Sequence, residues 1–184
     1  MKLYQKLDVP DFNIMVEELL ELSKTQIEQN LRYWDIKFIE FYKNTPTFFK
    51  YISSNFYRLP ILFRFYNTPP YGKLVAHIDN TQEAKNKIGF NFPLLGTTNT
   101  QMNFYYSPPD NVDLQYAGFE DMPVQLIKDK SKLILADSIE IDKPTLLRTD
   151  SIHEVVNNNN SYRLVLGMKF IGNTFEEVYK FNNN

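Results

Sequence analysis

The spacing of hydrophobic residues differs between the first part of the chain and the rest. Over residues 13–30, apolar side chains recur at roughly helical spacing, so they share one face of a helix. A second helix is expected over residues 45–56, where Pro46 suits the first turn. Residues 1–57 are therefore expected to form a helical N-terminal segment that packs against a larger body.

From residue 58 onward, short apolar or alternating runs are separated by turn-forming residues. Such runs predict β-strands, because successive side chains of a strand point to opposite faces of its sheet. The expected strands cover residues 61–66, 74–78, 88–95, 102–106, 112–116, 124–127, 132–136, 145–149, 152–156 and 162–170. The asparagine run 157–160 is one of several breaks able to reverse the chain. The pattern predicts a mainly β protein with N-terminal helices, whose β region is a sandwich or a barrel.

Length and composition are those of a single globular domain. The chain has 184 residues, of which 43% are hydrophobic and 23% are charged, and no repeat or linker divides it. We expect one domain over residues 1–184. Within it, a helical buttress covers residues 1–57, a β core covers 58–175, and a C-terminal tail covers 176–184.

Charge and cysteine content narrow the partners to consider. The formal net charge is -2, which gives no general attraction to nucleic acid or to anionic membranes. The chain has no cysteine, so any metal must be bound by nitrogen and oxygen ligands. The first residues lack the pattern of a secretory signal, and no apolar run is long enough to span a bilayer. We therefore expect a cytoplasmic protein that binds neither nucleic acid nor membrane, and the oligomeric state stays open.

The chain has only two histidines, and both fall on expected strands. His77 and Asp79 are two residues apart, so they point to the same side of one strand. His153 lies on a later strand, which a β-sandwich can return to the first. Two imidazoles and one carboxylate can occupy one face of an octahedral metal ion and leave three positions open. These three residues are the candidate catalytic metal ligands.

Arg163 follows His153 by ten residues and lies at the start of the last expected strand. Alternation places one set of residues on an apolar face and the other on a less apolar face: Leu164, Leu166, Met168 and Phe170 against Arg163, Val165, Gly167 and Lys169. If the second face lines a cavity, the guanidinium fork suits a carboxylate held by two hydrogen bonds. A dicarboxylate cosubstrate is the expected ligand. The alternative is a strand-edge arginine that pairs with Glu154.

The order of these residues resembles that of the iron(II)- and 2-oxoglutarate-dependent oxygenase superfamily. The shared pattern is His-x-Asp, a distal His and an Arg ten residues later, on a chain of helices followed by strands. The string from His77 to Asn80, preceded by Tyr66 and a Pro/Gly turn, is most similar to the prolyl-hydroxylase-like branch. The resemblance covers residues 60–172 as a pattern. It implies a double-stranded β-helix, which is a jelly-roll or cupin-like sandwich.

The resemblance also implies a dioxygenase that requires Fe(II), 2-oxoglutarate and O2. His77, Asp79 and His153 would bind the Fe(II), and Arg163 would bind the far carboxylate of 2-oxoglutarate. Oxidative decarboxylation would release succinate and CO2, with hydroxylation of a substrate that the sequence does not identify. That substrate is either a small molecule or a peptide or protein side chain.

Two further residues are expected near the cosubstrate. Tyr66 lies eleven residues before His77, where related enzymes often have a tyrosine that helps to bind it, and Asn91 lies on the strand after the His-x-Asp loop. The loops 80–87 and 107–123 are expected to select the substrate. Arg148 and Asp150 face away from His153 by simple alternation, so no role in metal binding is expected for them.

Two alternatives use the same strands. The first is a cupin-like module that binds a metal or a small molecule without oxidising anything. The second is a structural jelly-roll protein in which the histidines and the aspartate are incidental. A His-x-Asp triplet alone is a weak signal, and its weight comes from the distal histidine and the arginine at the matching offset.

Overall fold

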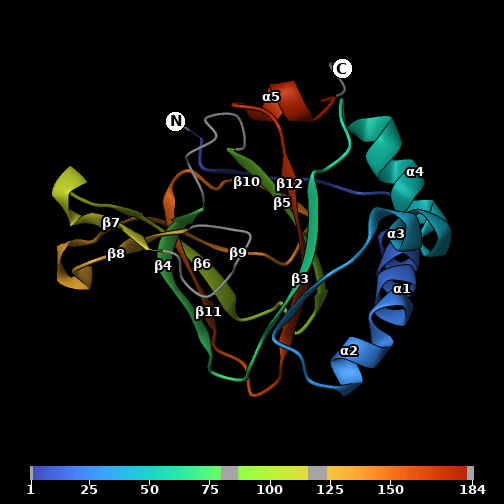
Figure 1. Ribbon diagram of the computed structural model, residues 1–184, viewed down its shortest axis with the longest axis horizontal. Coiled ribbons are helices and arrows are strands. Elements are labelled where there is room, and N and C mark those ends of the chain that lie inside the picture. The colour runs from blue at the N-terminus through green and yellow to red at the C-terminus, as the bar shows by residue number, and fades with distance from the viewer. Residues whose placement is uncertain (1, 80–86, 116–123, 182–184) are drawn as a thin grey trace.

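Two antiparallel sheets that face each other form the body of the protein. The computed structural model describes residues 2–79, 87–115 and 124–181. In this part of the chain each sheet has six strands, in the orders β1-β10-β5-β12-β3-β2 and β7-β8-β4-β11-β6-β9. Figure 1 shows the N-terminal helices gathered on the outer face of the first sheet, which we call the helix-backed sheet. The second is called the opposite sheet.

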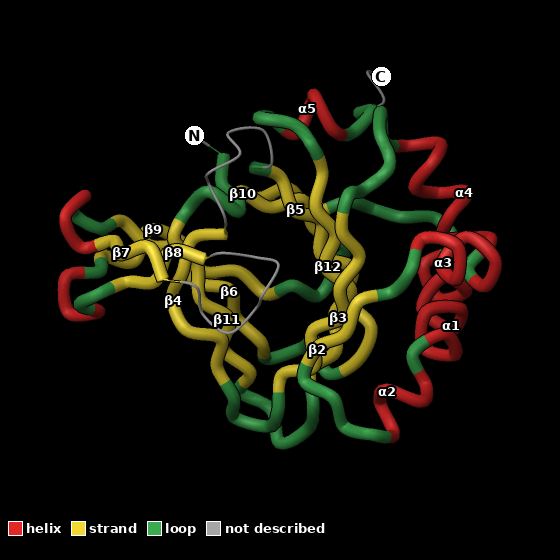
Figure 2. Tube along the Cα trace, viewed as in Figure 1, coloured by secondary structure: helices red, strands yellow, loops and turns green. Residues whose placement is uncertain are grey.

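The elements follow the chain in an order that alternates between the two sheets over much of its length (Figure 2). The strands are β1 (Tyr4–Lys6), β2 (Tyr33–Asp35), β3 (Leu62–Thr68), β4 (Lys73–Asp79), β5 (Ile88–Leu95), β6 (Thr100–Tyr106), β7 (Val112–Gln115), β8 (Val124–Ile127), β9 (Ile134–Glu140), β10 (Thr145–Arg148), β11 (Ile152–Asn157) and β12 (Arg163–Phe170). The α-helices are α1 (Phe12–Leu22), α2 (Lys24–Glu28), α3 (Phe38–Asn44), α4 (Pro46–Asn55) and α5 (Phe175–Val178).

Every strand expected from the alternating pattern is present, with ends that differ by a few residues. Two short strands were not expected, because β1 and β2 lie in the segment predicted to be helical. β1 pairs with β10 and β2 pairs with β3, so they form the two edges of the helix-backed sheet. A strand of three residues carries too little alternation to be recognised, and these two are defined by the strands beside them.

The helix predicted over residues 13–30 is two helices, so the prediction of one continuous helix was wrong. Ser23 separates α1 from α2, is fully buried, and donates a hydrogen bond from its hydroxyl to the carbonyl oxygen of Leu19. A serine that bonds back to the preceding turn competes with the helix and bends it. The helix predicted over 45–56 is confirmed as α4, with Pro46 in its first turn.

The N-terminus of α4 is held by a side chain from α1. Both carboxylate oxygens of Glu18 accept hydrogen bonds, one from the backbone N–H of Thr47 and one from that of Phe48, each at 3.0 Å. These N–H groups have no partner inside the helix, and a negative charge beside them stabilises the helix end by about 0.3–1 kcal/mol. The pair fixes α1 against α4.

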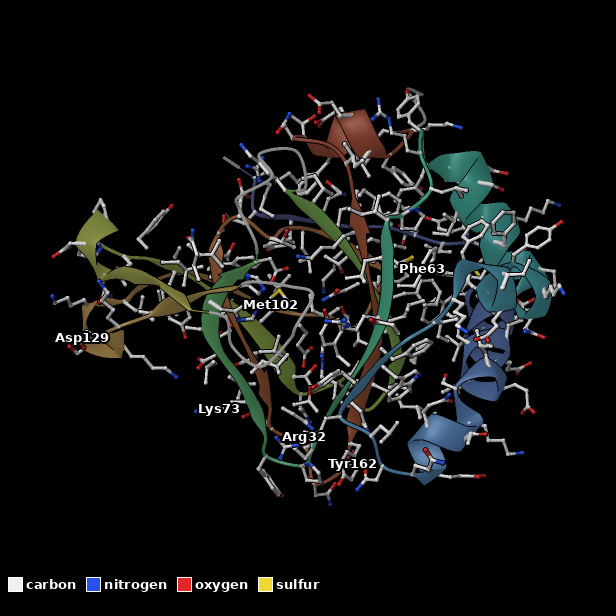
Figure 3. All side chains as sticks on the ribbon, viewed as in Figure 1. Arg32, Phe63, Lys73, Met102, Asp129 and Tyr162 are labelled. Carbon is white, nitrogen blue, oxygen red and sulfur yellow. The ribbon has the colours of Figure 1, made fainter. Side chains whose placement is uncertain are left out.

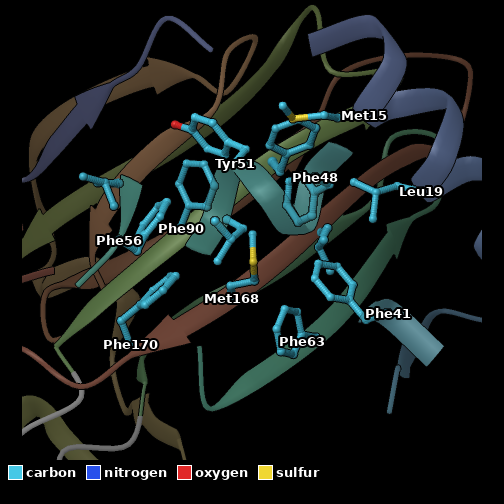
Figure 4. Packing of buried hydrophobic residues seen from close by; sticks show 14 of the residues in the cluster. Met15, Leu19, Phe41, Phe48, Tyr51, Phe56, Phe63, Phe90, Met168 and Phe170 are labelled. Atoms are coloured by element: carbon cyan, nitrogen blue, oxygen red, sulfur yellow. The ribbon is translucent and has the colours of Figure 1, made fainter. Parts of the chain in front are cut away.

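A large aromatic core fills the space between the helices and the sheet behind them (Figure 4). The helices contribute Phe41 and Phe48, neither of which is exposed, and the sheet contributes alternate residues of its strands. On β12 these are Leu164, Leu166, Met168 and Phe170, as the alternation predicts. Phe63 points from β3 towards the helices (Figure 3).

A smaller cluster lies between the two sheets and includes Met102, Phe104, Leu147 and Val155. Met102, which Figure 3 labels, contributes to it from β6. The fold is therefore mainly β, with one apolar layer under the helices and a thinner one between the sheets. None of the described helices is both long and apolar enough to cross a membrane.

The asparagine run after β11 forms a turn, as predicted. Asn157 is fully buried, and its side-chain amide donates hydrogen bonds to the carbonyl oxygens of Thr68, Pro69 and Ser161 at 2.9–3.2 Å. The side-chain oxygen of Asn157, Oδ1, accepts a hydrogen bond from the backbone N–H of Asn159 at 3.1 Å. The turn thus ties the start of β12 to the end of β3, and it fixes the position of Arg163.

Candidate metal and anion site

The pairing of β11 with β4 places the two histidines side by side. His153 and His77 are direct partners in this antiparallel pair, and their ring centroids are 4.4 Å apart. Asp79 lies two residues beyond His77 on β4, so its carboxylate is on the same side. One ligand atom from each of the three residues can be chosen so that all lie within 4.8 Å of one another.

The ligand atoms would have to move closer together to bind one metal ion. Oδ1 of Asp79 is 3.2 Å from Nε2 of His77 and 3.9 Å from Nε2 of His153. Two neighbouring ligands of an octahedral ion, each about 2.1 Å from the metal, lie about 3 Å apart. Two imidazole nitrogens and one carboxylate oxygen are ligands that divalent transition-metal ions accept. The residues present therefore fit such an ion.

Both imidazoles are oriented by backbone carbonyl groups. Nδ1 of His77 lies 2.7 Å from the carbonyl oxygen of Val75, and Nδ1 of His153 lies 2.9 Å from that of Ser151. A carbonyl oxygen only accepts, so each Nδ1 must carry a proton. In the neutral ring the lone pair then resides on Nε2, the atom that faces Asp79. This is the arrangement by which metal-binding histidines are usually held. His77 donates a hydrogen bond from Nε2 to Asp79 only when the ring carries a second proton, which a bound metal would displace.

Burial and neighbouring charges shift the pKa values of all three groups. Burial by itself would raise the pKa of Asp79, but the nearby Lys169 and the hydrogen bond from His77 outweigh it and hold that pKa well below its ordinary value. Burial and the neighbouring His77 lower the pKa of His153 to about 4. Burial also acts to lower the pKa of His77, yet the Asp79 carboxylate raises it overall. At neutral pH, Asp79 is ionised and His153 is neutral, as metal ligands must be.

These residues open onto a cavity between the two sheets. Its volume is about 70 Å³, enough for several water-sized groups. The residues that line it come from both sheets: Tyr66, Leu74, His77, Asp79, Asn91, Met102, Leu147, Thr149, His153, Val155, Arg163 and Val165. All six residues singled out from the sequence thus lie around one cavity. Between the polar groups the wall is aliphatic, which limits access of water.

Arg163 brings an unbalanced positive charge to this cavity. Its side chain is 2% exposed, and neither Nε nor Nη2 has a hydrogen-bond partner among the described residues. Burial lowers the pKa of its guanidinium to about 10, so the group remains charged at neutral pH. The alternative partner, Glu154, instead accepts a hydrogen bond from the Tyr105 hydroxyl at 3.0 Å and lies 3.6 Å from Lys130. The arrangement has the features of an anion site.

Two other arginines show what the same edge of a guanidinium does when a carboxylate is present. Nε and Nη2 of Arg64 donate to the two carboxylate oxygens of Asp35, each at 2.6 Å. Nε and Nη2 of Arg148 donate likewise to Asp150. In Arg163 these two atoms are buried and have no partner among the described residues. The edge that binds a carboxylate through two hydrogen bonds is therefore unused in a residue that lines the cavity.

Gly167 makes room for the aromatic wall of the cavity. A Cβ atom at this position would lie 2.6 Å from Cε2 of Tyr66 and 3.5 Å from Oδ1 of Asn91. Any larger residue would therefore push the Tyr66 ring away. Burial is the main factor that raises the pKa of the Tyr66 phenol, which stays neutral and able to donate a hydrogen bond.

Two residues of the site were given no role from the sequence. Alternation placed Lys169 on the same face of β12 as Arg163, as the structure shows, and its Nζ lies 3.0 Å from Oδ2 of Asp79. Thr149 lines the cavity, and its hydroxyl has no partner among the described residues. It follows the end of β10, where a period of two no longer predicts direction.

Two further expectations concern the pair Arg148 and Asp150 and the loops 80–87 and 107–123. Arg148 and Asp150 pair with each other and do not line it, as alternation predicts. The loops 80–87 and 107–123, expected to select the substrate, contain residues 80–86 and 116–123, which lie outside the described residues.

Comparison with known proteins adds no family to this description. No protein-family model matches the chain, and no curated protein matches it. Only the residues of the site therefore indicate a function.

Proposed function

We propose that the protein is an Fe(II)- and 2-oxoglutarate-dependent dioxygenase that hydroxylates a substrate still to be identified. The observation that carries the proposal is the pairing of two features in one cavity. Three nitrogen and oxygen ligands lie within 4.8 Å of one another, and a buried guanidinium presents two N–H donors without a partner. A keto acid that chelates the metal and ends in a second carboxylate would engage both.

The order of the strands supports a double-stranded β-helix of the jelly-roll or cupin type. β3, β4, β5 and β6 alternate between the two sheets, and β10, β11 and β12 alternate in the same way. β12 returns between β3 and β5, and β11 returns between β4 and β6. Strands that fold back between earlier ones in two facing sheets are the pattern of a jelly roll.

The charges of the site favour a dianion. Lys169 is paired with Asp79, which leaves the charge of Arg163 unbalanced among the described residues. A divalent ion would add further positive charge to a buried site. Since buried charge is costly unless it is compensated, a ligand with one carboxylate at the metal and one at the guanidinium offsets more of this positive charge than a monocarboxylate does.

Each of the four main residues of the site then has a separate role. His77, Asp79 and His153 would hold the metal through Nε2, Oδ1 and Nε2. Nε and Nη2 of Arg163 would bind the far carboxylate of the cosubstrate side by side. When bound, Fe(II) with 2-oxoglutarate supplies the activation of O2 that hydroxylation requires, with release of succinate and CO2.

The remaining residues position the ligand and exclude water. Tyr66 and Asn91 line the same cavity, and their hydroxyl and amide are the further hydrogen-bonding groups proposed for the cosubstrate. Leu74, Leu147 and Val155 line the space beside the histidines and keep it apolar. Exclusion of water strengthens the electrostatic interactions inside and protects reactive species from side reactions.

Of the two alternatives, only the structural protein fits the cavity less well. In a purely structural protein, the buried guanidinium would lower stability by about 1–3 kcal/mol, and no ligand would offset this loss. A binding module without oxygenase activity explains Arg163 equally well. It differs from the proposed enzyme only in the fate of the bound 2-oxoglutarate, and succinate formation distinguishes the two.

The test is a thermal unfolding series without oxygen, followed by a product assay with oxygen. Fe(II), and then 2-oxoglutarate in the presence of Fe(II), should each raise the melting temperature of the wild type. A ligand at about 100 times its dissociation constant stabilises the folded state by about 2.7 kcal/mol. Asp79→Ala should abolish the response to metal, whereas Arg163→Met should keep it and lose the response to 2-oxoglutarate.

Arg148→Met is the matched control, because Arg148 also binds a carboxylate with Nε and Nη2 but lies outside the cavity. This variant should keep both responses. If neither Fe(II) nor 2-oxoglutarate raises the melting temperature of the wild type, the proposed function is wrong. If both bind and no succinate forms under oxygen, the protein is a binding module.

A further inference from the structure

The two carboxylate oxygens of Asp79 are divided between the two sheets. Oδ1 faces the imidazoles of the opposite sheet, at 3.2 Å from His77 and 3.9 Å from His153. Oδ2 is 3.0 Å from Nζ of Lys169, which reaches across from β12 of the helix-backed sheet. Only Oδ1 is therefore directed at the proposed metal position.

This ion pair is shielded from solvent, so it is not an ordinary surface contact. The side chains of Lys169 and Asp79 are 12% and 15% exposed. A pair of this kind costs about as much in lost hydration as it gains in attraction, and an aliphatic pair of the same size would often be at least as stable. Stability alone therefore does not explain a lysine on a face whose neighbours include Val165 and Gly167.

The pair has a consequence for coordination of a metal. A carboxylate can bind a metal through one oxygen or through both. Binding through both would occupy two of the six positions and leave two open, whereas the proposed chemistry needs three. A hydrogen bond from the lysine ammonium to Oδ2 holds that oxygen away from the ion, as outer partners of metal-binding carboxylates do.

We infer that Lys169 is a positioning residue, which restricts Asp79 to coordination through Oδ1 and so keeps three positions of the metal open. The inference rests on the proposed metal site, and it goes beyond that site by assigning a role to a residue outside the three ligands. Lys169 touches neither the metal nor the reacting atoms. It acts through Asp79 alone.

The test counts the water molecules on a bound ion, a quantity that a merely structural ion pair would not change. Mn(II) is the probe, and water-proton relaxation per bound ion reports its exchangeable water ligands. Wild type and Lys169→Arg should each show three, because arginine retains a donor to Oδ2. Lys169→Met should let Oδ2 reach the ion and lower the inner-sphere relaxation by about one third, which is one water ligand in three.

Lys143→Met is the matched control, because it removes an exposed lysine that pairs with Asp8 at 2.8 Å and does not line the cavity. Its relaxation should equal that of the wild type. Unchanged relaxation in Lys169→Met, with Mn(II) still bound, would overturn the inference and leave the metal site intact. If Mn(II) does not bind to the wild type at all, the proposed metal site fails and the inference fails with it.

A structure of the Mn(II)-bound wild type tests the inference without any variant, and it decides the matter if Lys169→Met does not fold. Lys169 should remain within hydrogen-bond distance of Oδ2, with Oδ1 alone on the ion. An Asp79 that binds the ion through both oxygens in the wild type would refute the role assigned to Lys169.

Discussion

The two faces of the helix-backed sheet have opposite properties, although alternate residues of the same strands build both. The face under the helices presents Leu164, Leu166 and Met168 from β12 to a closely packed aromatic core. The face towards the opposite sheet presents Arg163, Val165, Gly167 and Lys169 from the same strand. On that side there are buried charges and a cavity of about 70 Å³.

The difference shows that close apolar packing and buried charge lie on opposite faces of one sheet. Burial of the apolar face stabilises the fold by about 25 cal/mol for each Å² removed from water. The other face includes a guanidinium with no partner and an ion pair shielded from solvent, neither of which adds much to stability. A rigid, well-packed layer behind the strands is what allows the inner face to hold such groups in position.

The largest expected effect is a loss of stability from the apolar face. Leu166 is fully buried, and Leu166→Ala should lower the free energy of unfolding by about 2–5 kcal/mol, because it leaves a cavity in packed surroundings. Chemical denaturation measures the loss, and titration with Mn(II) should show an unchanged metal affinity in the folded variant. A large fall in metal affinity would contradict the separation of the two faces.

The second expected effect is an increase in the free energy of unfolding. In the absence of ligand, Arg163→Met should raise the free energy of unfolding by about 1–3 kcal/mol, because it replaces buried donors that have no partner in the described part of the chain by an apolar side chain of similar length. Arg64→Met is the control and should lower it, since Arg64 binds Asp35 through two hydrogen bonds. If Arg163→Met proved as destabilising as Arg64→Met, Arg163 would have a structural role in the ligand-free protein.

The smallest expected effect is the pH dependence of stability from the two histidines, because their pKa values shift in opposite directions. The pKa of His153 is lowered to about 4 by burial and by His77, so its contribution to stability is present above about pH 6.5 and is lost as the pH falls towards 4. The pKa of His77 is raised overall by Asp79 against the effect of burial. Its contribution is therefore present below pH 6.5 and is lost as the pH rises through the folded value.

NMR titration of the ring protons measures the two pKa values separately, because the chain has only two histidines. The His77→Gln variant assigns the signals. One ring should titrate near pH 4 and the other above 6.5 in the metal-free protein. Two histidines that both titrate near 6.5 would mean that the inner face is hydrated like an ordinary surface.

The alternating pattern predicted most of the strands and the faces of β12, because period two is a local property of extended backbone. It also placed His77 and Asp79 on one side of β4, since they are two residues apart. The same pattern failed where local signals are short or mixed. β1 and β2 have three residues each, and Ser23 interrupts a helix whose apolar spacing continues beyond it.

By itself, the sequence determined which side chains share a face and which residue types are able to bind a metal or a carboxylate. Only the tertiary structure decided that β11 lies against β4, so that His153 meets His77, and that Asp35 pairs with Arg64 while no described residue pairs with the carboxylate-binding edge of Arg163. The reason is physical. Alternation is fixed by the backbone of one strand, whereas strand pairing, burial and the balance of charge depend on residues far apart along the chain. The proposed role of Lys169 depends on the tertiary structure, because only the fold brings its ammonium group within reach of Asp79.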